Sequence, residues 1–98
     1  MEQRGDINRE IGRAIADARK AVDPRYTGPE MARDLGMSYR HFKRLEAGEM
    51  RCPPDLLERV AEVLGTEGKL LYALAADRLK GLVRRDTTTD DVREILGL

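Results

Sequence analysis

Apolar residues recur at intervals of three or four along most of this chain, which is the spacing of one face of an α-helix. The first series predicts a helix from about Asp6 to Val22, because a proline follows two residues later. Its apolar members are Ile7, Ile11, Ile15, Ala18 and Val22. The charged residues Arg9, Glu10 and Arg13 between them are expected to form a solvated face.

The segment 27–48 predicts two short helices joined by a tight turn. Thr27 and Glu30 have the spacing of a capping box, which starts a helix. Gly36 stands where the end of that helix favours a residue that tolerates positive φ. Ser38 then offers a hydroxyl to the first turn of the second helix.

We expect these two helices at 28–35 and from Tyr39 to Ala47. In the second helix, Phe42 and Leu45 are expected to point into the core, where Met31 and Leu35 of the first helix would join them. The opposite side would expose a set of hydrogen-bond donors, namely Tyr39, Arg40, Lys43 and Arg44.

Three further helices are expected after two consecutive prolines. The fourth helix carries the apolar series Leu56, Leu57, Val60, Ala61 and Leu64. Thr66 is expected to cap a fifth helix that runs to about Lys80. Thr88 or Thr89 can cap a last short helix, which would extend to Gly97.

Composition agrees with an ordinary helical core. The chain has 98 residues, of which 41% are hydrophobic, and its aromatic residues are three tyrosines and one phenylalanine. A chain of this length is expected to form one domain that buries roughly 60 to 65% of its unfolded surface. We therefore predict an all-α fold of five or six helices. Because no apolar run could span a membrane and the start lacks the pattern of a signal peptide, we expect a cytoplasmic protein.

The sequence offers little for catalysis or metal binding. Cys52 is the only cysteine, which excludes an internal disulfide and every zinc site built from several cysteines. Ser38 and His41 are the only serine and histidine, and Ser38 is already needed as a helix cap. We therefore expect no enzyme, no metal and no cofactor, and we expect Cys52 to be a reduced thiol without a redox role.

The pattern A-x-x-L-G-M-S-x-x-x-F-x-x-L-E-x-G, from Ala32 to Gly48, resembles the signature of the Cro and phage-repressor-like regulators. The resemblance extends from about Ile7 to Leu71. It implies a lambda-repressor-like helix-turn-helix domain that binds duplex DNA in a sequence-specific way and regulates transcription. Residues 1–80 would form this domain and residues 81–98 a C-terminal extension for dimerisation or packing.

The resemblance also implies roles for individual residues. Base contacts are expected at the exposed face of the second motif helix, from Tyr39, Arg40, Lys43 and Arg44. Phosphate contacts are expected from Thr27, Gly28, His41 and Arg51. Alternatives stay open for several of these residues. Arg40 could be solvated surface, and Lys43 and Arg44 could contact phosphates instead of bases. The Tyr39 ring could cap Met37, and His41 could pack or simply be exposed. In the family, an arginine late in the first helix pairs with the glutamate of Glu-x-Gly, which implies a structural pair between Arg19 and Glu46.

Two features depart from the family pattern. Gly28 stands where relatives often carry a glutamine that binds a phosphate, so only its backbone amide is available here. The connection 22–26 is about two residues longer than usual, and it either adds a contact or is merely tolerated.

The zero net charge of the chain favours a dimer over a monomer as the DNA-binding unit. The chain has 18 basic and 18 acidic residues, so one copy should bind DNA modestly and in a salt-sensitive way. A homodimer would supply the missing affinity, and an apolar surplus near the C-terminus is a natural surface for it: Leu79, Leu82 and Val83. The alternative for these residues is packing under the C-terminal segment of the same chain.

The last helix is acidic and amphipathic, and three alternatives remain for it. It folds back on the fifth helix, docks on a partner subunit, or contacts another protein such as RNA polymerase. The alternative to a DNA-binding regulator is a protein-interaction module on the same scaffold, such as an antitoxin or a polymerase-binding factor, that acts through these C-terminal helices.

Overall fold

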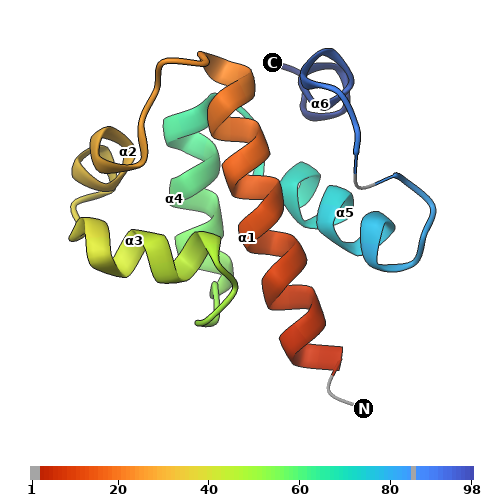
Figure 1. Cartoon of the computed structure of the whole chain (residues 1–98), viewed down its shortest axis with the longest axis horizontal. Coiled ribbons are helices and arrows are strands. Elements are labelled where there is room, and N and C mark those ends of the chain that lie inside the picture. Colours follow the sequence, from red (N-terminus) through yellow and green to blue (C-terminus); the bar gives the residue numbers. More distant parts are fainter. Residues whose placement is uncertain (1–2, 85) are drawn as a thin grey trace.

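The computed structural model describes residues 3–84 and 86–98, and within these ranges the chain forms six α-helices and no strand (Figure 1). The prediction of an all-α fold is therefore confirmed. The helices are α1 (Gln3–Val22), α2 (Gly28–Leu35), α3 (Tyr39–Glu46), α4 (Pro54–Leu64), α5 (Gly68–Leu79) and α6 (Thr89–Leu96).

Helix α1 is the central element of the fold and begins three residues earlier than predicted, at Gln3. It contacts α3, α4, α5 and α6, while the side of α1 that faces the viewer in Figure 1 is not covered by another helix. One expectation is corrected, because Glu10 is only 3% exposed and does not belong to a solvated face. Arg9 and Arg13 are exposed as predicted.

The core is one apolar cluster to which all six helices contribute. Ile11 and Ile15 of α1 are buried within this cluster. The buried residues of α2 and α3 are Met31, Ala32, Leu35, Phe42 and Leu45. Those of α5 and α6 include Leu71, Leu74, Ala75, Val92 and Leu96. Burial of these side chains stabilises the fold because each removes apolar surface from water.

Helix α6 folds back on its own chain, against α1 and, to a smaller extent, α5. The Arg93 guanidinium donates to the Ala21 carbonyl of α1 at 2.6 Å. The Thr66 hydroxyl donates to the Leu96 carbonyl at 2.5 Å. Thr66 was expected to cap α5, and this expectation is wrong, because Glu67 holds the capping position without a side-chain hydrogen bond. The caps of α6 itself follow the sequence, with Thr88 accepting from the Asp91 amide.

Helix α5 has a buried arginine in its last turn and ends slightly earlier than predicted. Arg78 has a fully buried side chain, and its Nη1 lies 2.8 Å from Oδ2 of Asp17 on α1. The helix ends at Leu79, and Gly81 then turns the chain with a φ of 78°. Leu82 therefore lies beyond the helix rather than on its apolar face, and it is 72% exposed.

Candidate nucleic-acid interface

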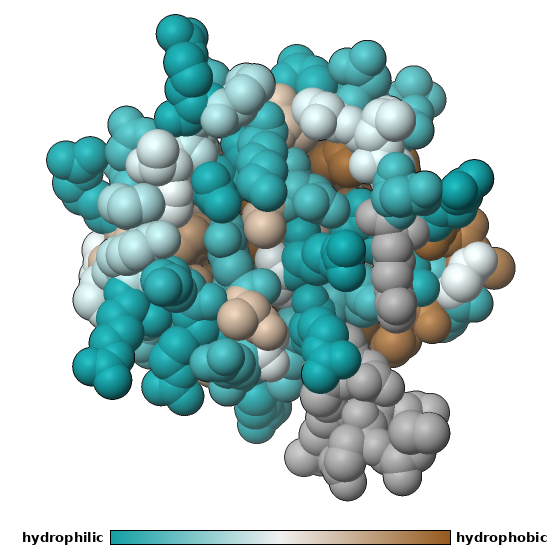
Figure 2. Space-filling view, in the orientation of Figure 1, coloured by the Kyte–Doolittle hydropathy of each residue, from teal (hydrophilic) through white to brown (hydrophobic). Residues whose placement is uncertain are grey.

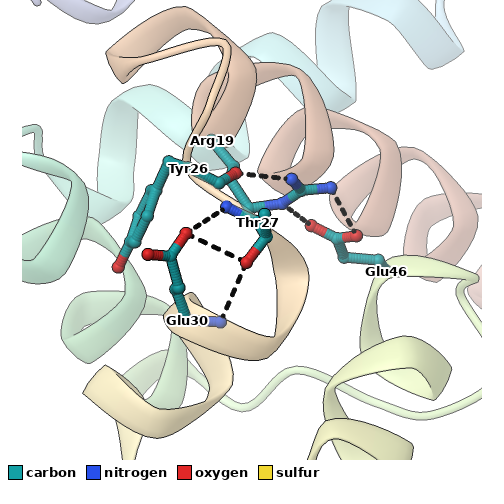
Figure 3. Close-up of polar contacts among 5 residues, drawn as sticks. All are labelled: Arg19, Tyr26, Thr27, Glu30 and Glu46. Atoms are coloured by element: carbon teal, nitrogen blue, oxygen red, sulfur yellow. Dashed lines mark hydrogen bonds and ion pairs between the residues drawn. The ribbon is translucent and has the colours of Figure 1, made fainter.

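Helix α2 begins with a complete capping box (Figure 3). The Thr27 amide donates to the Glu30 carboxylate at 2.9 Å, and the Thr27 hydroxyl donates to the same oxygen at 3.0 Å. In return, the Glu30 amide donates to the Thr27 hydroxyl at 3.3 Å. These hydrogen bonds favour the ionised carboxylate and lower the pKa of Glu30.

The turn between α2 and α3 is closed by local hydrogen bonds. Gly36 adopts the left-handed conformation, with a φ of 72°, which few other residues tolerate without strain. The Met37 amide then donates to the Ala32 carbonyl at 3.0 Å. Ser38 caps α3 by accepting from the His41 amide at 3.1 Å. The sequence thus sets the angle of α3 relative to α2 through three consecutive residues.

Helix α3 has one buried and one exposed face. Phe42 and Leu45 are 0% and 1% exposed and rest on the core. The exposed residues of the helix are Tyr39, Arg40, His41, Lys43 and Arg44. A shallow surface hollow brings together the four predicted base contacts with Ala47 and Glu49. At its rim, the Arg44 guanidinium and the Glu49 carboxylate, both more than half exposed, lie 4.0 Å apart.

The only carboxylate of α3 is turned away from this exposed face. Nε and Nη2 of Arg19 donate to the two oxygens of Glu46 at 3.0 and 3.3 Å (Figure 3). The remaining Nη1 donates to the Tyr26 carbonyl at 2.8 Å. The side chains of Arg19 and Glu46 are only 14% and 17% exposed, so little water weakens this forked pair. It ties α1, the 23–27 connection and the end of α3 together.

Close backbone contact also fixes the end of α3. A Cβ at Gly12 of α1 would lie 2.4 Å from the Glu46 carbonyl oxygen, and one at Gly48 would lie 2.4 Å from Cα of Arg9. Neither contact is sterically allowed, so only glycines let α1 approach α3 this closely. Sequence reasoning missed Gly12, although a glycine inside a helical pattern is itself a signal of close packing.

The longer connection before α2 adds contacts. The Tyr26 amide closes a turn on the Asp23 carbonyl at 2.9 Å, and the Arg25 amide donates to the Asp23 carboxylate at 2.9 Å. The Tyr26 hydroxyl donates to the carboxylate of Asp34 on α2. Burial, followed by this carboxylate neighbour, raises the pKa of Tyr26. The connection therefore positions α2 through Tyr26, whose hydroxyl donates to Asp34 of α2 and whose carbonyl accepts from Arg19 of α1.

The four residues predicted to contact phosphates do not all lie on one surface. Thr27 and Gly28 lie together at the start of α2, although Gly28 is buried and the Thr27 hydroxyl is engaged by Glu30. His41 is exposed on the first turn of α3. Arg51 is also exposed, but it lines a different groove, between α1, α4 and α5, together with Ile7 and Tyr72.

The other candidate groups lie apart from this face. Burial, with a smaller effect of Asp55, raises the pKa of the Cys52 thiol to about 11, so the thiol stays protonated at neutral pH. Among the described residues, no group of three or more acidic, histidine or cysteine side chains could hold a metal ion. None of the described helices combines the length and apolar character needed to cross a membrane.

The residues predicted for dimerisation gather at the end of α5. Leu79 and Val83 are half-buried and Leu82 is exposed. Figure 2 shows apolar surface along the right-hand edge of the molecule, over the end of α5 and the segment that follows it. Ile95 of α6 lines a hollow with Leu82 and Val83, a neighbour that the sequence did not reveal.

Comparison with known proteins gives one match. The sequence model of a protein family described as a helix-turn-helix domain matches residues 10–74. The matched range includes all of α2, α3 and α4, most of α1 and the first half of α5, and it ends before α6. Neither curated proteins nor solved structures gave a match.

Proposed function

The chain belongs to the helix-turn-helix domain family, and we propose that it is a sequence-specific, duplex-DNA-binding regulator of transcription. In this proposal α3 enters the major groove and α2 lies across the DNA backbone. One observation carries it: the exposed face of α3 presents Arg40, Lys43 and Arg44, while the only carboxylate of the helix, Glu46, is paired inward with Arg19. That face therefore keeps its positive charge although the whole chain is neutral.

Arg40 is the proposed principal base contact. It lies in the first turn of α3, which is the part of a reading helix that reaches deepest into the groove. Its guanidinium can donate two parallel hydrogen bonds to O6 and N7 of guanine. Lys43 and Arg44 follow one turn later, where they would contact bases or phosphates at the groove wall.

The flanking phosphates are assigned to the groups around the start of α2 and beyond α3. The Thr27 hydroxyl and the Gly28 amide lie at the positive end of the α2 dipole, which favours an anion. His41 and Arg51 complete the proposed set, although Arg51 lines a separate groove. These contacts would fix the register of the protein on DNA without reading sequence.

A homodimer is proposed as the binding unit, because a neutral chain gains little non-specific affinity from electrostatics. The proposed surface is the apolar patch of Leu79, Leu82 and Val83, with Ile95 at its border. Its rim carries Arg84 as well as acidic residues of α6, so a two-fold arrangement could pair unlike charges across the interface.

Readout by Arg40 is tested by selecting preferred DNA from random duplexes and then measuring Arg40→Ala on the best site. We expect a loss of about 1 to 3 kcal/mol in binding free energy and a relaxed preference at one base pair. Lys43→Ala should instead weaken all sequences more evenly and reduce the salt dependence of binding. Unchanged affinity and base preference in Arg40→Ala would refute the assignment. Selection of no preferred DNA at all would favour the protein-interaction alternative.

Dimerisation is tested with Leu82→Asp, because Leu82 is exposed and its replacement leaves the core intact. Truncation after Lys80 is a poorer test, since it would also remove the buried Val92 and Leu96. We expect sedimentation to show the wild type as a dimer on a site whose inverted half-sites are centred roughly 10 base pairs apart or a multiple of that. Leu82→Asp should bind a half-site normally and the full site weakly. A wild type that stays monomeric both free and on DNA would exclude this surface from the mechanism.

A further inference from the structure

The start of α2 and the start of α3 fit each other through Gly28 and Tyr39. Gly28 is buried, and a Cβ at its position would lie only 2.9 Å from Cε1 of Tyr39. Gly28 is not among the glycines with positive φ, so backbone conformation does not require a glycine there. The requirement is space: the missing side chain leaves the volume that one edge of the Tyr39 ring occupies.

The same ring lies under the ammonium of Lys43. Nζ of Lys43 is 5.6 Å from the centroid of the Tyr39 ring, within the range of a cation–π interaction. The two residues are four apart on α3 and therefore share one face of the helix. In the described ranges no ion pair involves Lys43, so no carboxylate competes with the ring for this ammonium.

We propose that Tyr39 is a positioning residue for Lys43, held in place by the space at Gly28, rather than the direct base contact that the sequence predicts. The proposal rests on the proposed DNA-binding function. Lys43 has a long, flexible side chain, and ordering it before binding lowers the entropy lost when it meets DNA. The hydroxyl of Tyr39 is not needed for this role, whereas the aromatic face is.

The free protein provides the first test, which needs no DNA. Nuclear magnetic resonance of the full chain should show the Lys43 ε-methylene protons shifted upfield, because they are bonded next to the ammonium that lies over the Tyr39 ring. Tyr39→Phe should preserve this shift. Tyr39→Leu should remove it, and Gly28→Ala should change it, because a Cβ at position 28 moves the edge of the ring. Tyr72→Leu is the matched control, since Tyr72 is 50% exposed compared with 45% for Tyr39 and lies on α5.

Binding to the selected DNA site provides the second test. We expect Tyr39→Leu to weaken binding about two- to fivefold in the chain that retains Lys43, which is the size of an exposed cation–π interaction. In a Lys43→Ala background the same change should have no measurable effect, because there is then no ammonium to position. Tyr39→Phe should bind within about twofold of the wild type and keep its base preference.

Three outcomes would overturn the proposal. Lys43 protons at the positions of an unstructured lysine in the wild type would show that the ring does not hold the side chain. An equal loss from Tyr39→Leu with and without Lys43 would show that Tyr39 contacts DNA itself. Altered base preference in Tyr39→Phe would show that its hydroxyl reads a base. If the wild type bound no DNA, the proposed function would fail, while the resonance shifts would still decide whether Gly28 and Tyr39 hold Lys43.

Discussion

The α2–α3 unit and the α5–α6 unit are built from different kinds of interaction. Gly36 and Ser38 close the turn between α2 and α3 through hydrogen bonds to residues a few positions away. The hydrogen bonds that hold α6 instead join residues far apart: Thr66 and Leu96 are 30 positions apart, and Arg93 and Ala21 are 72. Local hydrogen bonds therefore set the turn of the candidate interface, and the Arg19–Glu46 pair then fixes it to α1, whereas α6 is held to the rest of the chain by long-range hydrogen bonds and packing.

Helices α3 and α6, one from each unit, carry opposite formal charge. The exposed face of α3 is cationic, and in the same view as Figure 1 the surface over it is hydrophilic (Figure 2). Helix α6 exposes Asp90 and Asp91 in its first turn and Glu94 in the next. Acidic residues at a helix start are stabilised by the helix dipole. Zero net charge thus arises from separated patches, and a neutral chain can still present a basic face.

The largest expected effect concerns the support beneath α3. Phe42→Ala should cost about 3 to 5 kcal/mol of unfolding free energy, because Phe42 is fully buried and its removal leaves a cavity. That is a large share of the stability of a small domain, roughly 5 to 15 kcal/mol. Arg44→Ala, on the exposed face of the same helix, should change stability by less than about 0.5 kcal/mol. Urea unfolding followed by circular dichroism checks both, and similar losses in the two variants would contradict the assignment of faces.

The difference between local and long-range interactions also explains which parts of the fold can be predicted from the sequence. The bounds of α2 matched because Thr27, Glu30 and Gly36 act on their own neighbours. The cap at Thr66 failed because its hydroxyl has a partner, Leu96, that only the folded chain brings near. Helical spacing could not reveal that partner, since it carries no information about contacts between distant segments.

Buried charged residues also show that helical spacing does not reveal contacts between distant segments. Arg78 shares the buried face of α5 with Leu71, Leu74 and Ala75, a placement that the sequence analysis did not predict. What the pattern lacked was Asp17, whose carboxylate makes burial of that guanidinium tolerable. Residue-level base and phosphate contacts stay predictions, because they depend on a partner that neither the sequence nor the fold contains.

A medium effect is expected from breaking the buried pair between α1 and α5. Asp17→Asn leaves the Arg78 guanidinium buried beside a neutral amide, in a site where its Nε and Nη2 have no hydrogen-bond partner. Because the Asp17 side chain is 29% exposed and partly solvated, we expect a loss of about 1 to 3 kcal/mol rather than the full cost of an isolated buried charge.

Replacing Arg78 provides the control for the Asp17–Arg78 pair. Arg78→Met should change stability by less than about 1 kcal/mol, since an apolar side chain of similar length replaces a costly buried charge. The double variant should be no less stable than Arg78→Met alone. Urea unfolding of the wild type, the two single variants and the double variant gives the coupling free energy between Asp17 and Arg78. A greater loss from Arg78→Met than from Asp17→Asn would mean that the ion pair is a net source of stability, and the C-terminal unit would then depend on charge more than on packing.

The smallest effect is the pH dependence that Glu30 contributes at the start of α2. Glu30 has a lowered pKa in the folded state because it accepts hydrogen bonds from Thr27, so its contribution to stability is present above the unfolded pKa of about 4.5. That contribution is lost as the pH falls through the lower folded-state pKa. We therefore expect the wild type to lose more unfolding free energy than Glu30→Gln between pH 6 and about pH 3. Glu62→Gln, which changes an exposed carboxylate on α4, should follow the wild type. Parallel curves for the wild type and Glu30→Gln would mean that the capping box does not hold in solution, and the local origin of the interface would lose its main support.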